Sequence, residues 1–219
     1  VFPDLVVMRD TPLFSRAGKL AVLPDDVSKL VVNPVKFGGK VYTVSLTAQA
    51  PLGMIYNAKF FKDNKLSEPK TYAEFTKLLA DIKAKKVTPI VVGGKDLWHL
   101  GFTFSNYYLH DIALKNPNFI AERYAGKVKF TDANFVKFLG DWSAIYDMKK
   151  AWVDPGFTST ADNQTAAILT SGKAVMLYSG TWMLQQIKDA DPSFEIGWFP
   201  IPSPVDNKFN LIGGSTAQG

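Results

Sequence analysis

Apolar residues recur with the period of an α-helix in two parts of the chain. The first stripe repeats at intervals of three and four residues and consists of Phe75, Leu78, Leu79 and Ile82. Glu74 stands three positions after Thr71, the spacing of a capping box that supplies acceptors for two free backbone amides. A second stripe has the same period and consists of Phe135, Phe138, Leu139 and Trp142. We therefore expect two helices, the first beginning at Thr71, each burying one apolar face.

Short runs rich in β-branched and aromatic residues predict strands around these helices. Residues 88–94 form one run, bounded by proline and glycine, and residues 173–178 form another. Each run follows a predicted helix, so helix and strand alternate through the middle of the chain. Two further strand-like runs, at residues 40–46 and 53–56, come before the first helix. This alternation indicates an α/β fold.

The order of these elements indicates one lobe that is nearly whole and part of a second. We expect residues 49–195 to form the main α/β lobe, and residues 1–48 to contribute part of an N-terminal lobe with the first crossing strand. Residues 195–199 read as a strand and lead into prolines, which stiffen the backbone and disfavour sheet pairing, at positions 200, 202 and 204. Residues 196–219 are therefore predicted to cross back to the N-terminal lobe.

Composition and charge narrow the class of protein. The chain has 219 residues, of which 47% are hydrophobic and 21% charged, as in ordinary folded proteins. Its net charge of +5 is spread among carboxylates and aromatic residues, so a nucleic-acid partner is not favoured. There is no cysteine, which excludes disulfides, thiolate metal sites and cysteine nucleophiles. No apolar run approaches the ~20 residues of a membrane-spanning helix.

The order of short motifs resembles the solute-binding proteins of bacterial carbohydrate importers, the family that includes maltodextrin-binding protein. Each motif alone is common, whereas their shared order and spacing are more specific. In this sequence the motifs are Pro3-Asp4-Leu5-Val6-Val7, Gly18-Lys19-Leu20, Gly39-Lys40-Val41-Tyr42-Thr43-Val44, Met54-Ile55-Tyr56-Asn57, Pro69-Lys70-Thr71-Tyr72-Ala73-Glu74-Phe75, Phe130-Thr131-Asp132, Ser171-Gly172-Lys173-Ala174-Val175-Met176, Gly180-Thr181-Trp182 and Gly197-Trp198-Phe199-Pro200.

The resemblance implies a periplasmic-binding-protein-like fold of type II, with two α/β lobes joined by crossing strands and a ligand cleft between them. It implies a monomer outside the cytoplasmic membrane, in the periplasm or as a cell-surface lipoprotein. This monomer would bind a sugar or oligosaccharide and deliver it to the permease subunits of an ABC transporter, without a cofactor. A complete member would have further elements before Val1 and after Gly219, so we interpret the chain as truncated at both ends.

A sugar site needs flat aromatic side chains for the C–H faces of the ring and polar groups for its hydroxyls. Trp182 follows a predicted strand in a Gly-Thr-Trp turn, the usual place for a stacking aromatic residue in the related proteins; its glycine and threonine neighbours favour exposure over the alternative, a core tryptophan. Trp98 follows another predicted strand, and stacking on a sugar and packing in the core are both open for it. Asp96, beside Trp98, is a candidate for binding hydroxyls, with a solvated loop charge as the alternative.

Five further candidates lie near the ends of the chain or in the bend between the lobes. Gln49 lies in that bend, where related proteins place a polar ligand contact, with a plain turn residue as the alternative. Arg9 and Asp10 follow a strand-like run and could form bidentate hydrogen bonds with sugar hydroxyls or a surface ion pair with each other. Near the other end, the backbone amides of Gly214 and Ser215 could approach a ligand closely or form a simple turn.

Signatures of enzymes and of nucleotide or metal sites are missing from the sequence. His99 and His110 are its only histidines and do not form an HExxH motif, so no metal site is expected. No GxSxG elbow, Walker loop or GxGxxG fingerprint occurs. We therefore expect no catalytic residues. Two alternatives stay open: a carbohydrate-active enzyme with a carboxylate pair, and a binding protein of the same fold for a non-sugar solute.

Overall fold

The computed structural model describes residues 4, 6, 10–31, 34, 36–44, 50–147, 149–210 and 213–214. The chain divides into two units. Residues Val1–Ala50 and Gly213–Gly219 form the first unit, and Pro51–Ile212 form the second. In the described part of the first unit, the elements are α1 (Thr11–Arg16), α2 (Asp25–Ser28), β1 (Lys36–Phe37), β2 (Lys40–Val41) and β7 (Gly213–Gly214).

The first unit contains short elements with local caps. The strands β1 and β2 pair in an antiparallel hairpin, in which Lys36 lies opposite Val41. The predicted strand at residues 40–46 is therefore shorter than expected, because β2 ends at Val41; residues 45 and 46 lie outside the described residues. The backbone N–H of Leu13 donates a hydrogen bond of 3.1 Å to Oδ1 of Asp10, which caps α1.

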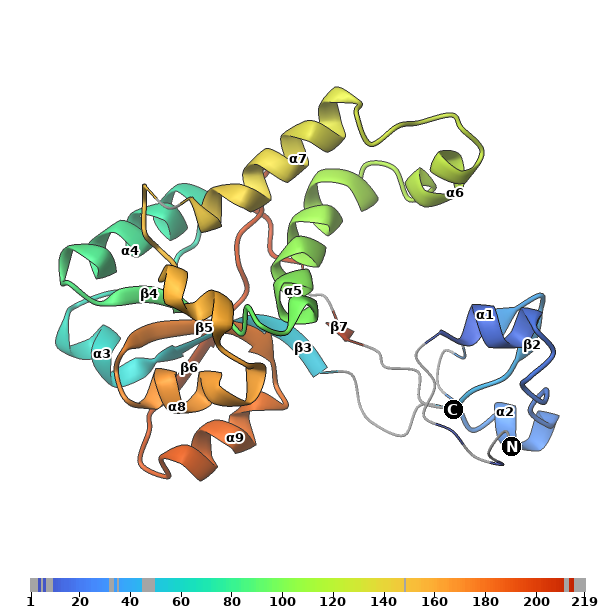
Figure 1. Ribbon diagram of the computed structural model, residues 1–219, viewed down its shortest axis with the longest axis horizontal. Coiled ribbons are helices and arrows are strands. Elements are labelled where there is room, and N and C mark those ends of the chain that lie inside the picture. Colours follow the sequence, from blue (N-terminus) through green and yellow to red (C-terminus); the bar gives the residue numbers. More distant parts are fainter. Residues whose placement is uncertain are drawn as a thin grey trace. The chain divides into compact units, whose positions relative to one another are not determined.

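A mixed sheet forms the centre of the second unit (Figure 1). Its strands lie in the order β4, β5, β3, β6, with β4 (Thr88–Val91) parallel to β5 (Ala174–Gly180). The strand β3 (Ala50–Asn57) is antiparallel to β5 and to β6 (Ile196–Phe199). Pro89 lies in β4, at one end of this strand order, where a missing backbone donor is tolerated. The four strand positions predicted for this region are confirmed.

Helices surround this sheet in the second unit. Their bounds are α3 (Ala58–Asp63), α4 (Tyr72–Ala84), α5 (Leu97–Tyr108), α6 (Phe119–Tyr124), α7 (Ala133–Ser143), α8 (Thr165–Thr170) and α9 (Met183–Ala190). The helix α5 continues as a π-helix, η1 (Leu109–Ala113). Short 3₁₀ turns are η2 (Ala144–Tyr146), η3 (Pro155–Ser159) and η4 (Asp162–Gln164).

The alternation of side chains along β3 gives the second unit two hydrophobic clusters, one on each face of the sheet. Met54 and Tyr56 belong to the larger cluster, which also contains the buried face of α4. Ile55, between them, belongs to the smaller cluster with residues of α8 and α9. Figure 1 shows α4 on one side of the sheet and α8 and α9 on the other. The α/β class predicted from the sequence is confirmed.

Both predicted helices are present. The side chain of Thr71 accepts a hydrogen bond of 3.1 Å from the backbone N–H of Glu74, so α4 begins where its capping residues indicated. The four apolar residues of the α4 stripe are all buried. In α7, Phe135 and Phe138 are buried, whereas Leu139 is 36% exposed. The buried face of α7 is therefore narrower than the apolar stripe from which the helix was predicted.

The strand β6, which the sequence places at the start of a return crossing, pairs with β3 in the sheet of the second unit. Proline residues follow it, as the sequence shows, and no strand is assigned between residues 200 and 210. The boundaries at residues 48 and 195 stay predictions.

Candidate ligand-binding site

Three aromatic side chains gather at the ends of two neighbouring strands in the second unit. The ring centroids of Trp98 and Phe102 are 5.4 Å apart, and those of Phe102 and Trp182 are also 5.4 Å apart. Trp98 is 49% exposed and Trp182 is 38% exposed. We call Trp98, Phe102 and Trp182 the aromatic cluster. Two of its members are the tryptophans that the sequence singled out.

Trp182 is held by the end of β5. The strand ends at Gly180, and Trp182 is the residue before the first turn of α9. A Cβ atom added to Gly180 would lie 1.9 Å from Cζ3 of Trp182, so the indole ring lies directly over this glycine. Only glycine leaves room for that arrangement.

Trp98 and Phe102 come from α5, which follows β4. The two residues are four positions apart and lie one above the other on the helix surface. Their ring planes are tilted by 69°, and those of Phe102 and Trp182 by 58°. The aromatic cluster therefore presents two separate indole surfaces rather than one flat platform.

A buried polar group lies beneath the aromatic cluster. His99, in the first turn of α5, is 2% exposed, and its Nδ1 is 2.6 Å from Oδ1 of Asp162. The backbone N–H of Asp162 in turn donates a hydrogen bond of 2.6 Å to Oδ2 of Asp96. Asp96 precedes α5 without capping it through its side chain. Its second oxygen, Oδ1, takes part in no hydrogen bond within the part of the chain that the structure describes.

The remaining predicted contacts belong to the first unit. Asp10 is exposed and caps α1, and Gly214 lies in β7. Arg9, Gln49 and Ser215 lie outside the described residues. The proposed roles of all five residues in ligand binding stay predictions.

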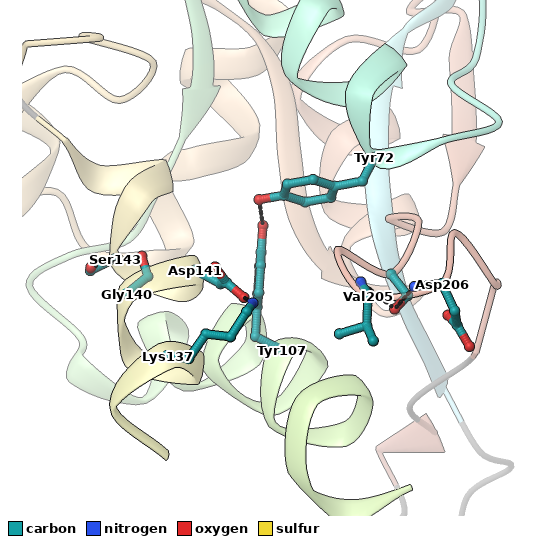
Figure 2. Close-up of polar contacts among 9 residues, drawn as sticks. Tyr72, Tyr107, Lys137, Gly140, Asp141, Ser143, Val205 and Asp206 are labelled. Atoms are coloured by element: carbon teal, nitrogen blue, oxygen red, sulfur yellow. Dashed lines mark hydrogen bonds and ion pairs between the residues drawn. The ribbon is translucent and has the colours of Figure 1, made fainter. Parts of the chain in front are cut away.

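A second polar cluster in the second unit joins α4, α5 and α7 (Figure 2). The hydroxyl oxygens of Tyr72 and Tyr107 are 2.8 Å apart, and Lys137 forms an ion pair with Asp141 one turn later on α7. Asp111 of η1 is 5% exposed; its burial, with the Asp141 carboxylate nearby, raises the pKa of the Asp111 carboxyl to about 6. Burial raises the pKa of Tyr107 well above its usual value. Tyr107 and Asp111 are buried among the helices, whereas the side chains of Lys137 and Asp141 are 64% and 27% exposed.

The described residues contain no group of three or more His, Asp or Glu side chains that could hold a metal ion. Within the same part of the chain, no helix is both long and apolar enough to cross a membrane.

The chain belongs to the family of bacterial extracellular solute-binding proteins, whose family model matches residues 2–218. It is 34% identical over 188 residues to the multiple sugar-binding protein of Streptococcus mutans, a match that covers 83% of this chain and 43% of that protein. It is 27% identical over 189 residues to an uncharacterized ABC transporter extracellular-binding protein of Pyrococcus horikoshii, covering 82% of this chain and 41% of the relative.

Solved structures agree on the fold. A chitin oligosaccharide binding protein, 27% identical, matches 96% of this chain and 54% of its own with a TM-score of 0.81. A solute-binding protein solved in complex with raffinose, 22% identical, matches 99% of this chain and 58% of its own with a TM-score of 0.76. The chain thus has the type II periplasmic-binding-protein fold of its family. It spans about half the length of the proteins it matches.

Sequence reasoning missed two members of this site. Phe102 stands four residues after Trp98, and this helical spacing of two aromatic residues was a local signal that could have found it. Asp162 lies 63 residues from His99, so no local pattern connects them. Only the folded chain brings these two residues together.

Proposed function

We propose that this chain is part of the substrate-binding component of an ABC importer and that it binds a carbohydrate. The observation that carries the proposal is the aromatic cluster, because two partly exposed indoles beside a third ring are suited to stack on the apolar faces of sugar rings. Membership of the solute-binding family and the similarity to a multiple sugar-binding protein support it.

The arrangement of the cluster favours an oligosaccharide over a single sugar. The ring centroid of each tryptophan lies 5.4 Å from that of Phe102, and each indole plane is tilted against the Phe102 ring, so each indole would stack on a different ring of one ligand. Oδ1 of Asp96, which takes part in no hydrogen bond among the described residues, would accept a hydrogen bond from a sugar hydroxyl group.

We also propose a second set of contacts and the partners of the protein. Arg9, Asp10, Gln49, Gly214 and Ser215 would supply polar contacts from a second lobe, so that ligand binding closes a cleft. The loaded protein would act outside the cytoplasmic membrane as a monomer, free in the periplasm or as a lipoprotein, and deliver its sugar to the permease subunits. It would have no enzymatic activity and need no cofactor.

Thermal denaturation with and without sugar tests the proposal. Raffinose or a chitin oligosaccharide at about a hundredfold excess over its Kd should raise the Tm by roughly 5–10 °C, because only the folded state binds it. The sugar should be recovered intact by chromatography. Phosphate and a polyamine, added in parallel, should leave the Tm unchanged.

Two results would contradict the proposal. Steady release of cleaved sugar would indicate a carbohydrate-active enzyme. A Tm increase with phosphate or polyamine, and none across a panel of sugars, would indicate a binding protein of the same fold for another solute.

A further inference from the structure

We infer that His99 is a positioning residue, which fixes the orientation of Trp98 through its hydrogen bond to Asp162. The inference rests on the proposed sugar-binding function. His99 is adjacent to Trp98 in the first turn of α5, and its ring centroid lies 6.0 Å from that of Trp98 and 5.5 Å from that of Phe102. The His99 ring therefore packs close to two members of the aromatic cluster.

The hydrogen bond has a defined direction. Oδ1 of Asp162 is 2.6 Å from Nδ1 of His99. A carboxylate accepts hydrogen bonds, so Nδ1 carries the hydrogen and donates it. The other ring nitrogen, Nε2, is buried and has no hydrogen-bond partner within the described part of the chain. The ring is thus attached to the rest of the structure by one polar contact, on its Nδ1 side.

Asp162 is itself firmly held. Its backbone N–H donates to Asp96 at 2.6 Å, and its carbonyl accepts a hydrogen bond of 2.7 Å from Oγ1 of Thr165. The chain also packs closely here, since a Cβ added to Gly93 would lie 2.8 Å from Cα of Asp162. Asp162 is therefore fixed in position, and its hydrogen bond with His99 links α5 to it.

The buried histidine has one satisfied and one unsatisfied nitrogen. Nε2 is desolvated without a hydrogen-bond partner in the described part of the chain, whereas Nδ1 supplies the donor for the Asp162 carboxylate. A hydrogen bond differs from apolar packing in being directional, so it selects one orientation of the ring and of the helix turn around it. Trp98 belongs to this same turn and is 49% exposed, so half of its surface has no packing to fix its orientation.

A fixed Trp98 matters because a pre-organised site loses less conformational entropy when a sugar binds. Without the hydrogen bond, we expect the first turn of α5 and its indole to sample several orientations. The sugar would then bind more weakly while the remainder of the fold stays intact.

Two substitutions at His99 separate positioning from simple filling of space. In His99→Asn, the side-chain amide falls near the position of Nδ1 and can still donate to Asp162. In His99→Gln, the amide falls near the position of Nε2 and leaves Asp162 without its donor. The two variants are both polar and uncharged, so they form a matched pair.

The primary measurement is the ¹⁹F NMR resonance of Trp98 in the chain labelled with 5-fluorotryptophan, assigned with Trp98→Phe. The second is the Kd for raffinose and for a chitin oligosaccharide by calorimetry. We expect His99→Gln to shift or broaden the Trp98 resonance and to raise the Kd roughly tenfold. His99→Asn should keep the Trp98 resonance and the Kd close to those of the wild type.

Asp162→Ala tests the same hydrogen bond from the other side and should reproduce the effect of His99→Gln if that variant fails to fold. Asp154→Ala is its control, since Asp154 caps η3 through the backbone N–H of Gly156 and has no hydrogen bond to α5. This control should leave the Trp98 resonance unchanged.

An unchanged Trp98 resonance and Kd in both His99→Gln and Asp162→Ala would overturn the inference. So would equal losses in His99→Asn and His99→Gln, which would assign His99 to core packing. If the wild-type chain binds neither sugar, the proposed function fails for these probes, while the NMR comparison still decides whether His99 positions Trp98.

Discussion

At the scale of single residues, the position of Trp182 makes a direct prediction about ligand binding. Its indole lies over Gly180 and against Phe102, and it leaves 38% of its surface exposed. Trp182→Ala should weaken sugar binding roughly tenfold or more, because a stacking surface is lost, and should leave the unfolding transition cooperative. Calorimetric titration with raffinose measures the first effect and thermal denaturation the second.

Tyr124→Ala is a suitable control for this substitution. Tyr124 is 90% exposed and lies on α6, outside the aromatic cluster. Tyr124→Ala should leave the Kd for raffinose unchanged. If Trp182→Ala unfolds the chain instead, Trp182 belongs to the core and the sugar-stacking role is wrong.

Asp111 allows a prediction about pH. Its pKa is raised from 3.8 to about 6 by burial and, next, by Asp141, against the opposing effects of Lys137 and Lys115. Between about pH 4 and pH 6, the folded state therefore keeps a proton that the unfolded state releases. The protonated Asp111 carboxyl stabilises the folded state fully below about pH 4, and this stabilisation is lost as the pH rises to about 6.

Asp111→Asn removes the buried charge. It should raise the free energy of unfolding by up to roughly 3 kcal/mol above pH 6 and have little effect below pH 4. Urea denaturation of both proteins between pH 4 and 8 measures the difference. A difference that stays constant across this range would show that the Asp111 carboxyl does not change its ionisation on folding.

Some residues of the candidate site could be predicted from the sequence, and others could not. Trp98 and Trp182 were identified because each follows a predicted strand, a relation that the local sequence contains. The ring of Phe102 between them, and the pairing of His99 with Asp162, depend on how distant segments pack. A sequence pattern places a residue on an element, and only packing decides which residues from different elements meet.

At the scale of elements, two glycines with different surroundings give opposite predictions. Gly140 lies inside α7 (Figure 2). A Cβ atom added there would meet nothing within 4 Å. Gly140→Ala should therefore raise the free energy of unfolding by about 0.5–1 kcal/mol, since alanine restricts the unfolded chain and favours helix. A Cβ on Gly94 would lie 2.7 Å from the backbone Cα of Thr158. Gly94→Ala should lower that free energy by about 1–3 kcal/mol.

Urea denaturation of both variants tests this pair. A stabilising effect of Gly94→Ala would mean that the segment before α5 can move away from residues 157–158. It would also weaken the argument that α5 is attached to a fixed support.

The elements that the sequence predicted well are those with strong local signals. For α4, the cap at Thr71 and the apolar stripe agree, and the buried residues are those of the stripe. The helix α5 and its continuation as the π-helix η1 were not predicted from the sequence, because no local pattern specifies the backbone hydrogen bonds of a π-helix. The predicted strand after Lys40 is shorter than expected, since β2 ends at Val41 in its hairpin with β1.

At the scale of the whole molecule, the second unit contains everything that an independent domain needs. Both hydrophobic clusters lie within residues 51–212, as do the four paired strands from Pro51 onward. The aromatic cluster, His99 and Asp162 lie in the same unit. A segment with its own sheet and core is expected to fold without the rest of the chain.

A fragment of residues 51–212 should therefore unfold in one cooperative transition, and its ¹⁹F resonance for Trp98 should match that of the full chain. Its affinity for raffinose should be lower, because the proposed contacts from Arg9, Asp10, Gln49, Gly214 and Ser215 are absent. Calorimetry and NMR of the fragment measure both properties. Equal affinity in fragment and full chain would mean that the first unit contributes nothing to the site, and the two-lobe binding mode would then be wrong.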